Sequence, residues 1–183
     1  GAGGGVFSDA RALEPLTRAP TLRTANILLD QLHGAFAREV AALGVASRLT
    51  VLRQFAALGR HLVSPWKVAI AGPPNVGKSS LVNALAGFQR SIVAPVAGTT
   101  RDAVTVPVAF DGWPVELTDT AGIRHAADAL EAQGVERARR VLAEADLVVW
   151  VLDATSPEPE WPESGSPLLV VNKSDRPAAW EPP

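Results

Sequence analysis

The chain has 183 residues, 47% of them hydrophobic, with Lys+Arg 17, Asp+Glu 19 and a formal net charge of −2. That length holds one domain with a sizeable core, with or without a small helical partner, and the charge excludes an overall basic field that would attract nucleic acid or anionic lipid. The absence of cysteine excludes disulfides and thiolate metal sites, and no apolar run approaches a membrane span, so we expect a cytoplasmic protein without a membrane partner.

The first 64 residues are predicted to form a small helical segment. Residues 1–20 open on GAGGG and hold two prolines, so we expect them to be loose, because dense glycine raises the entropic cost of ordering. Apolar residues then recur at steps of three or four over residues 22–43 and again over 49–62. This pattern predicts two antiparallel helices that need a partner surface, and Ser64-Pro65 marks the expected domain boundary.

Residues 65–183 are predicted to form an α/β domain with a mostly parallel sheet. Strands alternate with helices, and several strands are near-continuous apolar runs, as buried parallel strands require. The expected strands are residues 66–71, 103–110, 114–118, 147–152 and 168–171. The expected helices are residues 79–86 and 134–144.

A hairpin and a loop complete this pattern. The strands at 103–110 and 114–118 are joined across Asp111-Gly112-Trp113, and Pro107 places the first of them at or near a sheet edge. Residues 154–166 are too rich in proline for a helix and should form an exposed loop.

Residues 72–79 read GPPNVGKS and match the pattern G-x-x-x-x-G-K-[ST] between a predicted strand and a predicted helix. In this context, backbone N–H groups of the loop and of the helix N-terminus bind phosphate oxygens. Lys78 is expected to reach the β- and γ-phosphates, and the Ser79 hydroxyl to bind Mg²⁺. The nucleotide-binding residues expected in this segment are Asn75, Val76, Gly77, Lys78, Ser79 and Ser80.

Residues 172–175 read NKSD and follow the predicted strand at 168–171. Asn172 is suited to hydrogen-bond a base edge, and Lys173 to lay its stem along the ring. The Asp175 carboxylate can accept two N–H bonds from guanine, whereas adenine leaves such a site with unpaired polar groups. The motif therefore predicts GTP or GDP as the ligand, and an ATP-using enzyme is the disfavoured alternative.

Two segments between these motifs carry candidate switch residues. In DTAGIR, Asp119 is expected to hold Mg²⁺ through a water, and the Gly122 N–H to contact the γ-phosphate. In AGTTRD, Thr99 and Thr100 are expected to bind the nucleotide, and a threonine here can bind Mg²⁺ only while the γ-phosphate is present. Ile123 has no polar atom with which to orient an attacking water.

These motifs together resemble one family of P-loop GTPases. The stretches GPPNVGKSSLVNALAG, AGTTRD, DTAGIR, GVERAR, ADLVVWVLDA and NKSD are similar to the tRNA-modification GTPase family called TrmE or MnmE, within the group of Era, EngA and septins. The resemblance covers most of residues 66–175 and implies the P-loop GTPase fold. LRTANILLDQLHGAFAREV also resembles the helical domain into which this family's GTPase domain is inserted.

The resemblance implies a route to hydrolysis without a glutamine. Family members bind K⁺ beside the phosphates when two GTPase domains dimerise, which implies Asn75 as a K⁺ ligand and Thr100 as the Mg²⁺ ligand of the switch. A glutamate orients the water, and alignment with the family places it at Glu131. From the sequence alone, Asp128 and Glu136 are also nearby acids, and a solvated surface acid is the alternative reading of Glu131.

The implied function is GTP hydrolysis in the modification of the tRNA wobble uridine, with a second copy and a flavin-dependent subunit as partners and tRNA bound only indirectly. Parts of the family pattern are missing, among them the loop that backs guanine, because the chain ends eight residues after Asp175. We therefore expect a C-terminally incomplete GTPase domain. The alternative is a GTP/GDP-binding switch module with negligible hydrolysis that regulates a protein partner.

Overall fold

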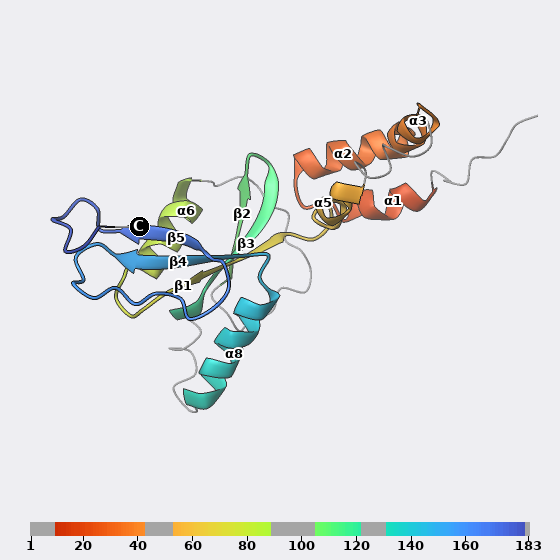
Figure 1. Cartoon of the computed structure of the whole chain (residues 1–183). Coiled ribbons are helices and arrows are strands. Elements are labelled where there is room, and N and C mark those ends of the chain that lie inside the picture. Colours follow the sequence, from red (N-terminus) through yellow and green to blue (C-terminus); the bar gives the residue numbers. More distant parts are fainter. Residues whose placement is uncertain (1–9, 43–52, 89–104, 122–130, 182–183) are drawn as a thin grey trace, which may run out of the picture. The chain divides into compact units, whose positions relative to one another are not determined.

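The computed structural model describes residues 10–42, 53–88, 105–121 and 131–181 (Figure 1). Two compact units divide the chain. The first contains the helices before Pro65 together with the hairpin turn Ala109–Pro114. The second contains the other described residues from Trp66 onward. No helix in the described ranges has both the length and the apolar character to span a membrane.

The helices of the first unit are more numerous than the sequence indicates. They are α1 (Ala10–Thr17), α2 (Leu22–Leu32), α3 (Ala35–Ala42) and α5 (Ala56–Arg60). The expectation of a loose segment over residues 1–20 is wrong for α1, which forms although Pro15 lies inside it. Helix α1 packs against α2, and this tertiary contact outweighs the helix-breaking effect of Pro15 in a segment of otherwise good helix formers.

The single helix expected over residues 22–43 is two helices, because α2 ends at Leu32 and α3 begins at Ala35. Gly34 between them has φ 82, a left-handed conformation that a helix cannot contain. The apolar spacing continues across this break, so periodicity alone does not detect it. The helix end expected at Gly44 lies outside the described residues.

Helix α2 begins at a hydrogen-bonded cap that also contacts the hairpin turn. Thr21 and Thr24 form a capping box, in which the Thr24 N–H donates to Thr21 Oγ1 and the Thr21 N–H donates to Thr24 Oγ1. Thr21 Oγ1 donates to the Gly112 carbonyl at 2.6 Å, and Arg23 Nη1 donates to the Asp111 carbonyl at 2.8 Å and pairs with its carboxylate. The turn thus supplies part of the partner surface that the helical segment needs.

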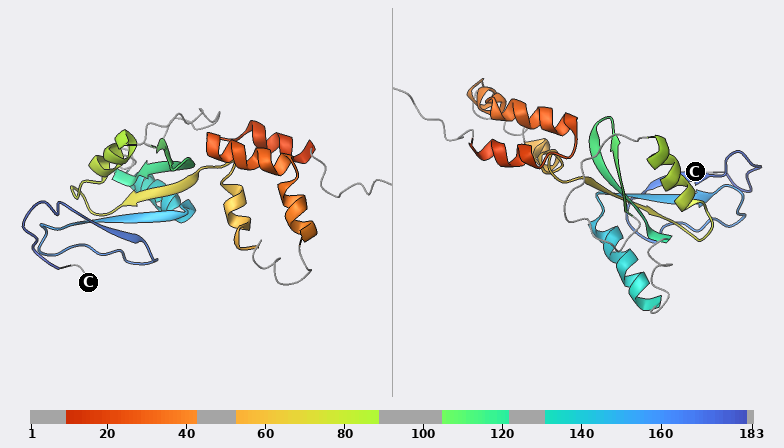
Figure 2. Two further views of the ribbon diagram at one scale, coloured as in Figure 1. Left: turned by 90° about the horizontal axis from the view of Figure 1, so that it is seen from above. Right: turned by 180° about the vertical axis from the view of Figure 1, so that it is seen from behind.

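The second unit is built on a five-stranded sheet in the order β2-β3-β1-β4-β5 (Figures 1 and 2). The strands are β1 (Trp66–Ala71), β2 (Thr105–Phe110), β3 (Trp113–Asp119), β4 (Leu147–Asp153) and β5 (Leu168–Asn172). β1 pairs in parallel with β3 and β4, and β4 pairs in parallel with β5. The order places β2 at an edge, which confirms the expectation from Pro107.

The hairpin and the predicted helices are confirmed with small changes of boundary. A two-residue turn joins β2 to β3, with φ 46 at Asp111 and φ 76 at Gly112, as a tight hairpin requires. Helices α6 (Lys78–Phe88) and α8 (Glu131–Glu144) both contact β1, which lies between them (Figure 2). The core of the unit consists of fully buried apolar side chains. Among these are Ile70, Val82, Val108, Leu117, Val151 and Leu152.

Candidate nucleotide-binding site

The predicted site residues that the structure describes gather at the carboxyl ends of the parallel strands. In the strand register, Ile70 lies opposite Asp119 and Asp153 lies opposite Asn172. The loops after β1, β3, β4 and β5 therefore leave the sheet at the same edge. In open α/β sheets this edge is where ligands bind.

The loop after β1 folds tightly because two glycines adopt conformations that other residues rarely take. Gly72 has φ 136, and a Cβ built on it would lie 2.4 Å from the Val151 carbonyl oxygen. Gly77 has φ 96, and a Cβ there would lie 2.2 Å from Asn172 Nδ2. The first glycine lets the loop pass over β4, and the second lets it approach the NKSD motif.

A pocket of about 590 Å³ opens at this loop and the first turn of α6. Helix α6 begins at Lys78, so its N-terminal N–H groups lie at the pocket. Such a terminus favours anions through unpaired N–H groups and the helix dipole. The lining residues are Gly72, Pro74, Asn75, Gly77, Lys78, Ser79, Ser80, Thr120 and Ala121.

Lys78 is buried at the base of this pocket, with 6% of its surface exposed. Its Nζ donates to the Gly72 carbonyl at 2.9 Å and to the Pro73 carbonyl at 2.5 Å. These carbonyl dipoles help to stabilise the buried ammonium, since burying a charge is costly unless polar groups satisfy it. The ammonium is therefore held within the loop and can exchange these contacts for phosphate oxygens.

Ser79, which lines the pocket, contacts Asp119, although the two residues lie 40 positions apart. Ser79 Oγ donates to Asp119 Oδ2, and the Ala121 N–H donates to Asp119 Oδ1 at 2.8 Å. Only 3% of the Asp119 surface is exposed, so its carboxylate has little contact with bulk water. Thr120 Oγ1 donates to the Ile70 carbonyl at 3.0 Å and fixes the chain after β3 against β1.

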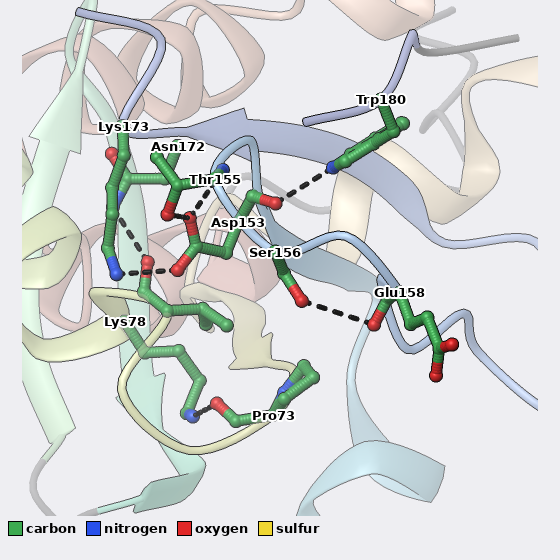
Figure 3. A network of polar contacts seen from close by, with 10 residues as sticks. Pro73, Lys78, Asp153, Thr155, Ser156, Glu158, Asn172, Lys173 and Trp180 are labelled. Carbon is green, nitrogen blue, oxygen red and sulfur yellow. Dashed lines mark hydrogen bonds and ion pairs between the residues drawn. The ribbon is translucent and has the colours of Figure 1, made fainter. Parts of the chain in front are cut away.

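The NKSD motif contacts the phosphate loop directly. Asn172 Nδ2 donates to the Val76 carbonyl at 2.8 Å, which joins two segments 96 residues apart. Lys173 has φ 60, and its Nζ forms an ion pair with Asp153 Oδ2 at 2.5 Å (Figure 3). Asp175 is exposed on the loop that follows, where its carboxylate is accessible to a ligand.

Asp153, the last residue of β4, is a site residue that the sequence analysis missed. Its carboxylate accepts hydrogen bonds from the Thr155 N–H at 2.9 Å, from Thr155 Oγ1 at 2.7 Å and from Lys173 Nζ at 2.5 Å. The hydrogen bond from Lys173 and those from Thr155 lower the pKa of Asp153 from 3.8 to about 2. An acid directly after a buried strand, at the edge that carries NKSD, is the signal that could have identified it.

Several predicted site residues lie outside the described part of the chain. These are Thr99, Thr100 and Gly122, together with Ile123 and the competing acid Asp128. The backbone of Glu131 begins helix α8, but its side chain is not among those described.

The comparison with protein families agrees with this geometry. Residues 67–173 match the family described as 50S ribosome-binding GTPase. The chain belongs to this GTPase family. The match spans β1 to the start of the NKSD motif and so contains both the phosphate loop and Asn172. The P-loop GTPase fold expected from the sequence is thereby confirmed, and GTP or GDP is the ligand that such a domain implies.

The domain is similar to that of curated tRNA modification GTPases named MnmE, as the motifs indicate. It is 48% identical to an MnmE of Thermus thermophilus over 119 residues, which is 64% of this chain and 28% of the relative. Identity with MnmE of Pseudomonas paraeruginosa is 45% over 143 residues, or 72% of this chain and 31% of the relative. The chain therefore spans under a third of the length of these relatives.

Among solved structures, the chain is similar to Aquifex aeolicus Era bound to GDP and AlF4−. The sequence identity is 36%, the match covers 60% of this chain and 40% of that chain, and the TM-score is 0.42.

Proposed function

We propose that this chain binds GTP and GDP at the described pocket and hydrolyses GTP, with residues 65–183 as the GTPase domain and residues 1–64 as a helical segment. The observation that carries the proposal is the contact between Asn172 and the phosphate loop at Val76. The phosphate-loop motif alone would be compatible with any nucleoside triphosphate. The contact joins a phosphate-binding loop to a guanine-type motif in one site.

Phosphate binding is assigned to the loop and to the start of α6. Backbone N–H groups from Asn75 to Ser80 and the helix dipole favour the negative oxygens, and Lys78 adds a full positive charge. Guanine binding is assigned to the NKSD motif. Asp175 would accept two N–H bonds from the base edge, Lys173 would cover the ring face, and Asn172 would hold the motif against the loop.

Mg²⁺ is proposed to bind beside the phosphates, and the residues present fit that ion. The Ser79 hydroxyl and the Asp119 carboxylate already meet, and oxygen ligands of this kind are those that Mg²⁺ takes in phosphate sites. Thr100 is proposed as a further Mg²⁺ ligand. The Gly122 N–H is proposed to contact the γ-phosphate. A bound Mg²⁺ would neutralise charge on the phosphate oxygens.

Hydrolysis is proposed to depend on Glu131 and on K⁺, an assignment that rests on the sequence resemblance. Glu131 begins α8, twelve positions after Asp119, and would orient the attacking water. Asn75 lines the pocket and offers a side-chain oxygen for K⁺. The positive charge of K⁺ beside the phosphates would replace an arginine finger, and pairing of two GTPase domains would enclose the site.

The wider biological role follows from the curated relatives. Their name, tRNA modification GTPase, supports a role in tRNA modification. The sequence resemblance is the basis for proposing the wobble uridine as the modified nucleoside. A second copy of this chain and a flavin-dependent subunit would be the protein partners in the cytoplasm, with tRNA bound only indirectly.

The test is GTP turnover by the purified chain at high protein concentration in KCl and in NaCl, with GTP and GDP affinity measured alongside and ATP as competitor. Turnover stimulated by K⁺ and lost in Glu131→Ala supports the full proposal. Glu136→Ala is the matched control, because Glu136 is an exposed acid on the same helix and should leave turnover unchanged. GTP binding without turnover in either salt would instead establish a switch module, and equal competition by ATP would refute the guanine assignment.

A further inference from the structure

The ion pair between Asp153 and Lys173 connects the end of β4 to the NKSD motif, and the GTPase motifs do not account for it (Figure 3). The side chains are 15% and 27% exposed, so the pair is partly shielded from solvent. Shielded pairs lose less of their attraction to screening than exposed surface pairs do. Lys173 is the residue whose stem is proposed to cover the guanine ring.

The acceptor in this pair is held rigidly. Thr155 donates two hydrogen bonds to the Asp153 carboxylate, from its N–H and its hydroxyl. The backbone carbonyl of Asp153 accepts a hydrogen bond from Trp180 Nε1 at 2.9 Å, and the Ala154 N–H donates to the Asn172 carbonyl at 3.0 Å. Thr155 thus orients the carboxylate, and the other two contacts hold the backbone at Asp153 and Ala154 against β5 and against the chain after Asp175.

Lys173 itself adopts a backbone conformation that needs support. Its φ of 60 lies in the left-handed region, which costs energy for a residue with a Cβ. A free lysine side chain also loses much rotamer freedom when a ligand orders it. The ion pair fixes the far end of the side chain, so this loss occurs during folding and not when the base binds.

We propose that Asp153 is a positioning residue for guanine binding, which acts by holding the Lys173 side chain in place as a preformed platform for the base. The inference rests on the proposed function of the NKSD motif and deepens it. Asp153 needs no contact with the nucleotide, because it acts through Lys173. The alternative role is purely structural, as a link between β4 and the residues around Thr155 and Trp180.

A double-mutant cycle separates these roles. GDP affinity is measured by displacement of a fluorescent GDP analogue for the unaltered chain, Asp153→Asn, Lys173→Ala and the double variant. Asp153→Asn preserves shape and removes the charge, and freeing one long side chain should weaken GDP binding about tenfold. In the Lys173→Ala background the same change should alter affinity less than about twofold, since coupled residues are not additive.

The inference is overturned if Asp153→Asn weakens GDP binding equally in the unaltered and Lys173→Ala backgrounds. It is also overturned if Asp153→Asn does not weaken GDP binding in the unaltered background. Glu158→Gln is the matched control, because Glu158 is an exposed acid of the following loop whose carboxylate points away from Lys173 (Figure 3), and it should leave GDP affinity unchanged. If the unaltered chain fails to bind GDP, the proposed function itself is refuted. Binding that Asp153→Asn leaves unchanged refutes the positioning role alone.

A second variant covers the case in which Asp153→Asn does not fold. Thr155→Val keeps the ion pair but removes the 2.7 Å hydrogen bond that fixes the carboxylate. We expect about threefold weaker GDP binding in the original background, which corresponds to the loss of one hydrogen bond of modest net strength. In the Lys173→Ala background we expect no change in GDP binding. Weakening that is the same in both backgrounds would contradict the positioning role.

Discussion

Gly77 is a position at which one added methyl group should disturb the link between the phosphate loop and the NKSD motif. A methyl group at Gly77 must fit a backbone with φ 96 and would lie 2.2 Å from Asn172 Nδ2. The side chain of Asn172 must then move, and its 2.8 Å hydrogen bond to the Val76 carbonyl is lost. A single methyl group therefore separates the phosphate loop from the guanine motif.

The cost can be worked out from these two contributions. A residue with a Cβ in a sparsely populated backbone region costs about 1–3 kcal/mol. Loss of a modest hydrogen bond adds about 1 kcal/mol. We expect Gly77→Ala to lower the free energy of unfolding by about 2–4 kcal/mol and to reduce GDP affinity sharply.

The matched control is Gly87→Ala. Gly87 lies in α6, is exposed, and a Cβ built on it meets no atom within 4 Å. Alanine there should raise the free energy of unfolding by about 0.4–1 kcal/mol, because it removes freedom from the unfolded chain. Urea unfolding measures both variants, and equal stability of Gly77→Ala and the unaltered chain would refute the conformation and contact assigned to Gly77.

Three further predictions concern other contacts of the molecule. Because the folded pKa of Asp153 is lowered from 3.8 to about 2, its ionised form stabilises the fold above pH 4, and this contribution disappears as pH falls from about 4 to 2. Urea unfolding at pH 5 and pH 2.5 should show Asp153→Asn to be less stable than the unaltered chain by at most about 2 kcal/mol at pH 5 and by much less at pH 2.5; a difference that does not depend on pH would contradict this. Thr21→Ala removes a helix cap and the 2.6 Å hydrogen bond to the Gly112 carbonyl, so thermal unfolding should show a loss of about 1–2 kcal/mol, and an unchanged melting temperature would argue against the contact. Asp175→Asn should reduce the preference for GDP over inosine diphosphate in competition binding, since the carboxylate is proposed to accept a hydrogen bond from the guanine amino group; an unchanged preference would remove Asp175 from base recognition.

The sheet and its helices could be predicted because their sequence signals are local. Strands such as β4 are apolar up to their last residue, and the turn at Asp111-Gly112 is favoured by residues that tolerate positive φ. The phosphate loop could be located for the same reason, since its glycines lie at fixed spacing between a strand and a helix.

The features that the sequence did not predict depend on contacts over long separations or on a single backbone angle. Helix α1 contains Pro15 and forms against α2, so its local propensity is misleading. The break at Gly34 interrupts an apolar pattern that continues on both sides. In the sequence, Asp153 is an ordinary acid at the end of a strand. Its role depends on Lys173, which lies 20 positions later and contacts Asp153 because β5 pairs with β4.

The polar side chains of the site are prearranged by one another. In the described part of the chain, every buried side-chain nitrogen or oxygen has a hydrogen-bond partner. Lys78 donates hydrogen bonds to carbonyls of the phosphate loop, and Ser79 donates one to the carboxylate of Asp119. Phosphate and the proposed Mg²⁺ would therefore replace existing hydrogen bonds, so the affinity would depend on the difference between the old and new partners and not on the new contacts alone. The Asp153–Lys173 pair is proposed to remain when the base binds, which makes the guanine side the rigid half of the site and the phosphate side the half whose contacts exchange.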